Sequence, residues 1–88
     1  MYKNKLMRMA MQGRLYICTS EKNTEDGVGT PRKVNGKTMC FRRGGIDDLK
    51  YLVKYPERAK DYLEYFWVET DGKLEKVAGM RRKDSRPP

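Results

Sequence analysis

Histidine is absent from this sequence of 88 residues. Its absence excludes histidine-dependent catalytic triads, histidine metal ligands and the most common general base near neutral pH. Cysteine is scarce as well, and Cys18 and Cys40 lie too far apart in sequence to resemble a structural zinc motif. We therefore expect no metal or other cofactor. We interpret the two cysteines as buried, reduced thiols of a cytoplasmic protein, with a disulfide between them as the alternative.

Long hydrophobic runs are also missing. No stretch of about 20 apolar residues occurs, so we expect no membrane span. With 38% apolar and 36% charged residues, the core must be small, and a cavity for a large cofactor is hard to build. Dimerisation would add buried surface, although nothing in the sequence requires it.

Acidic residues are missing from two segments. Residues 1–20 and 31–45 contain bases but no acid, whereas 46–75 contain eight acids against five bases. The net charge of +8 is therefore concentrated in parts of the chain. A basic surface attracts polyanions, which predicts nucleic acid or an acidic protein surface as the partner.

Two dipeptides predict β-hairpins. Asn35-Gly36 and Asp71-Gly72 suit the positive φ angles of a type I′ turn, and residues typical of strands flank both. A further strand is expected over 14–19, which is rich in aromatic and β-branched residues.

The N-terminal segment allows two interpretations. Met7, Met9 and Met11 alternate with more polar residues, and this period of two favours a strand over 5–11. The alternative is a helix, because methionine and leucine have good helix propensity.

Helical spacing of apolar residues predicts a helix over 46–54, and Pro56 is well placed to start a second helix over 56–66. The expected fold is a small α+β domain, in which an antiparallel sheet of about four to six short strands in hairpins packs against this helical pair. We assign residues 1–79 to the domain and 80–88 to a basic, disordered tail.

The favoured hypothesis is a non-catalytic protein that binds DNA or RNA with weak sequence specificity. Single-stranded nucleic acids are bound by cations that contact phosphates and by aromatic rings that stack on bases. The candidate residues are Arg14, Tyr16, Lys33, Lys37, Phe41, Arg42, Arg43, Arg81, Arg82 and Lys83.

The alternative hypothesis is a small inhibitor or adaptor that docks on a partner protein. Tyrosine is enriched at protein interfaces, and the acidic helical segment contains Tyr51, Tyr55, Tyr62 and Tyr65. The small size and basic charge would also suit an accessory protein of a phage or mobile element, acting in the host cytoplasm. No group of residues predicts an enzyme.

Overall fold

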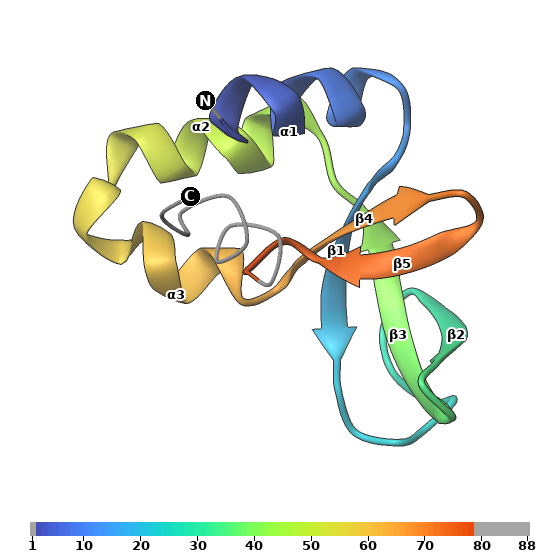
Figure 1. The fold of residues 1–88 in the computed structure, drawn as a ribbon. Coiled ribbons are helices and arrows are strands. Elements are labelled where there is room, and N and C mark those ends of the chain that lie inside the picture. Colours follow the sequence, from blue (N-terminus) through green and yellow to red (C-terminus); the bar gives the residue numbers. More distant parts are fainter. Residues whose placement is uncertain (1, 79–88) are drawn as a thin grey trace, which may run out of the picture.

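The computed structural model describes residues 2–78 and contains one five-stranded antiparallel sheet with three α-helices gathered beside it (Figure 1). It confirms the predicted α+β class. In chain order the elements are α1 (Tyr2–Met11), β1 (Leu15–Ser20), β2 (Thr30–Val34), β3 (Lys37–Arg43), α2 (Ile46–Lys54), the 3-10 turn η1 (Pro56–Arg58), α3 (Ala59–Leu63), β4 (Phe66–Thr70) and β5 (Lys73–Lys76).

The strand order is β2-β3-β1-β4-β5, so that β1 is central and β2 and β5 form the two edges. Both predicted hairpin turns are confirmed. Asn35 and Gly36 have φ values of 53° and 78°, and Asp71 and Gly72 have values of 52° and 79°. Positive φ at both central residues is the geometry of a type I′ turn, whose twist matches that of the flanking strands.

The face of the sheet that carries the helices buries the larger apolar cluster. Alternate residues of β1 and β4, such as Leu15 and Val68, are fully buried there against the helices. The complete cluster consists of Leu6, Met9, Leu15, Ile17, Leu49, Leu52, Leu63, Phe66, Val68 and Val77.

The opposite face buries a second cluster because the sheet curls around it. Phe41 and Trp67 meet edge to face with ring centroids 5.6 Å apart, and Cys18 and Met39 pack with them. Tyr16, Val34 and Leu74 are partly buried around this inner cluster. Apolar residues on both faces of the sheet therefore exclude water, although the chain is short.

A link between non-neighbouring strands accompanies the curl. Arg32 on β2 donates from Nη2 to Oε2 of Glu69 on β4 at 2.9 Å and to the carbonyl oxygen of Gly72 at 3.1 Å. Since β3 and β1 lie between these strands in the sheet, the contact spans the mouth of the curled face. We call this pair of residues and the Gly72 carbonyl the closure.

The strand predicted over 5–11 is wrong, because the segment forms α1. Leu6, Met9 and Ala10 recur at helical spacing and pack into the larger cluster, where Leu6 and Met9 are buried. The methionine alternation fits a strand, but a helix brings this apolar side against α2, and tertiary packing decides the outcome.

The helix predicted over 56–66 is shorter than expected. It consists of the 3-10 turn and α3, and it ends before Phe66, which already belongs to β4. Phe66 pairs with Ile17 of β1, so strand pairing replaces the last helical turn. The helix predicted over 46–54 is confirmed with those bounds. The predicted tail over 80–88 lies outside the described residues.

Cys18 and Cys40 are both buried and unpaired, which agrees with the expected free thiols. Burial raises the pKa of the Cys18 thiol above its ordinary value, which favours the protonated form. Within residues 2–78, no helix is long and apolar enough to cross a membrane.

Candidate nucleic-acid interface

Two of the predicted residues, Tyr16 and Arg43, are in contact at one end of the sheet, and a third, Arg14, lies two positions before Tyr16. Tyr16 of β1 is paired with Arg43 of β3, and Arg14 precedes Tyr16 on the same face of the chain. The guanidinium of Arg43 lies 5.9 Å from the centre of the Tyr16 ring, within the range of a cation–π contact. We call Arg14, Tyr16 and Arg43 the arginine–tyrosine cluster.

The adjacent turn leaves room for Arg43. Gly13 has a φ of 72°, and a β-carbon at this position would lie 3.1 Å from Nη1 of Arg43. Its positive φ and its lack of a side chain both favour glycine here. The turn between α1 and β1 therefore helps to seat the guanidinium beside the tyrosine.

Arg14 is held in place by neutral acceptors. Its Nε donates to the carbonyl oxygen of Glu69 at 2.8 Å, its Nη1 to Oε1 of Gln12 at 3.0 Å, and its Nη2 to Oγ1 of Thr70 at 3.4 Å. Because none of these groups is charged, Arg14 is oriented without being neutralised. Arg43 likewise forms no ion pair with any acid in the described part of the chain.

Arg42 differs from its neighbour because successive residues of a strand point to opposite faces. Its Nη2 lies 2.9 Å from Oδ1 of Asp48, and its Nη1 lies 3.3 Å from Oδ2. Oδ2 also accepts the backbone N–H of Gly45 at the start of α2. The hydrogen bond with Arg42 is the main reason why the pKa of Asp48 lies below its ordinary value. Arg42 therefore stabilises the junction between β3 and α2, and its charge is compensated.

Lys33 and Lys37 are exposed at the hairpin between β2 and β3. Lys37 begins β3 and Arg43 ends it, so the two residues are separated by about 20 Å at the usual rise per residue of a strand. The structure thus divides the predicted basic residues between the two ends of β3 and does not gather them in one patch.

Phe41 is not available for stacking on bases. Only 3% of its surface is exposed, and its ring packs against Trp67 in the inner cluster. This prediction is wrong because the curl of the sheet, which the sequence does not reveal, covers the face that Phe41 occupies. Arg81, Arg82 and Lys83 lie outside the described residues.

The tyrosines of the alternative hypothesis do gather. The ring of Tyr51 lies 4.7 Å from that of Tyr55 and 4.6 Å from that of Tyr62, measured between centroids. A hydrogen bond with Tyr62 is the main reason why the pKa of Tyr51 is raised. Tyr65 is 53% exposed and lines, with Tyr51 and Tyr62, a cavity of about 260 Å³ that Arg42 and Asp48 also border.

Sequence reasoning missed two features. The closure joins residues 37 positions apart, and no local sequence pattern predicts such a contact. The second feature is an apolar groove between α1 and α2. Interpreting the N-terminal segment as a strand left no helix α1 to form it. The helical spacing of Leu6, Met9 and Ala10 was the signal that could have predicted this helix. Among residues 2–78, no group of three or more cysteine, aspartate and glutamate side chains is placed to hold a metal ion.

Comparisons with protein-family models, curated proteins and solved structures found no match to this chain.

Proposed function

We propose that this protein is a non-catalytic binder of single-stranded nucleic acid and that the arginine–tyrosine cluster is its primary contact. The observation that carries the proposal is that Arg43 lies over the half-buried ring of Tyr16, with Arg14 two positions before Tyr16 in the chain, while neither arginine is paired with an acid of the described chain. Cations beside an aromatic ring are the combination that holds a phosphate and stacks a base.

Each member of the cluster has a distinct role in this proposal. Arg14, oriented by its hydrogen bonds, contacts a phosphate oxygen. The planar guanidinium of Arg43, supported by the ring of Tyr16, offers its outer surface to a base. Lys33 and Lys37, at the far end of β3, would track the backbone of a longer strand. Arg42 is not part of the interface, because Asp48 already engages it.

The test is fluorescence anisotropy of labelled single- and double-stranded oligonucleotides, of DNA and of RNA, titrated at several salt concentrations. We expect saturable binding to single strands whose affinity falls log-linearly with salt. Arg43→Ala should weaken binding by on the order of tenfold, because stacking is worth about 1–3 kcal/mol per base. Lys60→Ala, which removes an exposed base on α3, is the control and should change affinity little. Absence of binding at low salt, or equal losses in the two variants, would contradict the proposal.

A second candidate function is docking on a partner protein through the tyrosine surface. The supporting observation is the cavity of about 260 Å³, beside which Tyr51 and Tyr65 remain 40% and 53% exposed. Tyrosines around a recess are typical of protein interfaces. A pull-down partner that survives nuclease treatment and is lost in a Tyr51→Ala/Tyr65→Ala variant would favour this function over nucleic-acid binding.

A further inference from the structure

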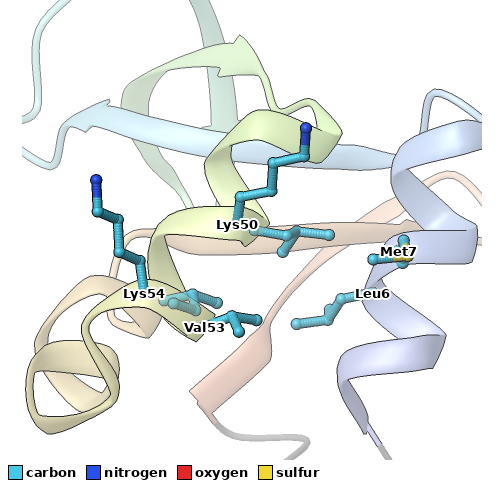
Figure 2. A pocket seen from close by; sticks show the side chains of 7 residues that line it. Leu6, Met7, Lys50, Val53 and Lys54 are labelled. Carbon is cyan, nitrogen blue, oxygen red and sulfur yellow. The ribbon is translucent and has the colours of Figure 1, made fainter.

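The helical side of the molecule carries an open apolar groove that the nucleic-acid hypothesis does not use. It lies between α1 and α2, has a volume of about 350 Å³ and is bordered by Leu6, Met7, Leu49, Lys50, Leu52, Val53 and Lys54. Figure 2 shows Leu6 and Met7 approaching it from α1 and Val53 from α2, whereas the side chains of Lys50 and Lys54 extend from α2 away from the space between Val53 and Leu6. Apart from the lysine amino groups, the lining is hydrocarbon and sulfur.

Apolar exposure continues beyond the groove along both helices. On α1, Met7 and Met11 are 42% and 73% exposed, and they are four positions apart, so they share one helical face. On α2, Ile46 and Val53 are 38% and 62% exposed and are seven positions apart, or about 10 Å along the helix. A compact ligand would fill only the groove, whereas a helix lying along it would also cover these side chains.

The charges around the groove are predominantly positive. Lys50 and Lys54 are four residues apart on α2, and their amino groups point in the same direction in Figure 2. On the other side of the groove, α1 contributes Leu6 and Met7, and that helix contains no acid. Asp47 lies 3.5 Å from Lys50, but both side chains are highly exposed, and such a pair is weak enough to exchange partners.

This charge discriminates between occupants. A second copy of the chain would bring the same bases face to face, which costs energy. The chain's own residues 80–88 carry four bases and one acid, so they too are poorly matched to the groove. An amphipathic helix with acidic residues beside its apolar stripe would complement both the apolar lining and the basic rim. The flexible side chains of Met7 and Met11 can adapt to the shape of such a stripe.

We infer that the groove between α1 and α2 is a docking site for an acidic amphipathic helix of a partner protein. The apolar stripe of that helix packs on Met7 and Val53, and its carboxylates pair with Lys50 and Lys54. The protein thereby presents one surface to nucleic acid, at the end of the sheet, and another to a protein, on the helices.

The test is selection from a displayed library of helical peptides of about 18 residues, long enough to form helix in solution. Leucines are fixed along one stripe, and the flanking positions vary among glutamate, lysine and glutamine. We expect binders in which glutamate exceeds lysine at the flanks. In a titration followed by amide ¹H–¹⁵N shifts, the changes should concentrate in residues 4–11 and 46–54.

Two variants distinguish the groove from nonspecific charge attraction. Lys50→Glu/Lys54→Glu should lower the affinity for a selected acidic peptide by roughly tenfold, because two attractive charge pairs become repulsive. This variant should instead prefer the counterpart peptide with lysine at the flanking positions. Lys60→Glu/Lys73→Glu changes exposed lysines elsewhere, with the same loss of positive charge, and should keep the original preference. Met7→Gln/Val53→Gln alters only side chains that are already well exposed, so it should fold normally and still lose roughly tenfold in affinity.

Several results would overturn the inference: no binder in the library, binders without an excess of glutamate, or shift changes centred on Tyr51 and Tyr62. Vesicles of phosphatidylserine and phosphatidylcholine provide the remaining arm of the test. If they bind through Lys50, Lys54 and Val53 while the selected peptides do not compete, the surface is a membrane contact and the assignment to a partner helix is wrong.

Discussion

The guanidinium of Arg32 on β2 and the carboxylate of Glu69 on β4 are 2.9 Å apart, although two strands separate them within the sheet. The same guanidinium nitrogen also reaches the carbonyl oxygen of Gly72 in the β4–β5 turn. These contacts fasten the two outer hairpins of a curled sheet to each other. They lie over the inner cluster, in which Phe41 and Trp67 are buried.

We expect Arg32→Ala to lower the free energy of unfolding by about 1 kcal/mol, since it removes a partly exposed ion pair and a hydrogen bond to Gly72. A double-mutant cycle with Glu69→Ala, measured by urea unfolding, should give a coupling energy of about 0.5–1 kcal/mol. A coupling near zero would show that the ion pair between Arg32 and Glu69 adds no net stability.

The inner cluster should tolerate loss of a polar atom better than loss of volume. Nε1 of Trp67 is buried and has no hydrogen-bond partner in the described part of the chain. Trp67→Phe should therefore change the free energy of unfolding little. Removing the unsatisfied N–H relieves a penalty of about 1–3 kcal/mol, which offsets the packing that the smaller ring loses. Phe41→Ala should cost about 3–5 kcal/mol, close to the whole stability of a domain of this size.

Circular dichroism during thermal unfolding distinguishes these two variants. We expect a cooperative transition near that of the parent protein for Trp67→Phe and a largely unfolded Phe41→Ala at room temperature. Trp67 is the sole tryptophan, so its emission in Phe41→Ala reports independently on opening of the cluster. A well-folded Phe41→Ala would mean that the inner cluster adds little to stability.

The junction of β3 and α2 should be sensitive to acid. The pKa of Asp48 is lower in the folded protein than its ordinary value. The ionised carboxylate therefore adds to the free energy of unfolding above the ordinary pKa of aspartate, and this contribution is lost as pH falls through the folded-state pKa. Asp48→Asn should lower stability by about 0.5–1 kcal/mol at pH 7, a modest figure because the pair is partly exposed.

Urea unfolding at pH 7, 5 and 3 tests this expectation. The difference in the free energy of unfolding between the parent protein and Asp48→Asn should decrease towards pH 3, as the carboxylate of Asp48 in the parent protein becomes protonated. Arg42→Ala should lower the free energy of unfolding by less than Asp48→Asn does, since Asp48 still accepts the hydrogen bond from the backbone N–H of Gly45. A difference that does not vary with pH would indicate that the charge of Asp48 is unimportant.

Two glycines with positive φ should respond unequally to alanine. A β-carbon on Gly36 would meet no atom within 4 Å. Gly36→Ala should therefore lower the free energy of unfolding only through the strain of a φ of 78°, by about 1 kcal/mol. A β-carbon on Gly29 would lie 2.4 Å from the carbonyl oxygen of Phe41, so Gly29→Ala must also displace β2 from β3. Melting temperatures should fall by about 4–8 °C for Gly36→Ala and by clearly more for Gly29→Ala. Equal effects would contradict the steric argument.

Local patterns predicted the parts of the fold that local chemistry determines. Asn-Gly and Asp-Gly specify their turns through backbone preferences, and the helix over 46–54 has acids in its first turn and a stripe of apolar residues. The N-terminal helix was mispredicted because its methionines satisfy both periodicities. Only contact with α2, a long-range interaction, selects the helix.

The candidate site depended even more on tertiary structure. The sequence identified Arg42 and Arg43 as equivalent bases, but Asp48 engages the first, whereas the second lies beside Tyr16. Phe41 appeared to be a surface aromatic because the curl that buries it arises from contacts between distant hairpins. Alternation along a strand separates the two faces, but it does not say which face remains open to a ligand.

The curl has a consequence for the edges of the sheet. Edge strands that are long and flat invite pairing with strands of other molecules, and this is a common route to aggregation. Here β2 and β5 are short, and the closure draws their two hairpins towards each other. Pro31 further removes one N–H donor from β2, and the exposed Lys33 adds charge beside it. The contact that closes the inner cluster thus also protects the protein against growth into a larger β-structure.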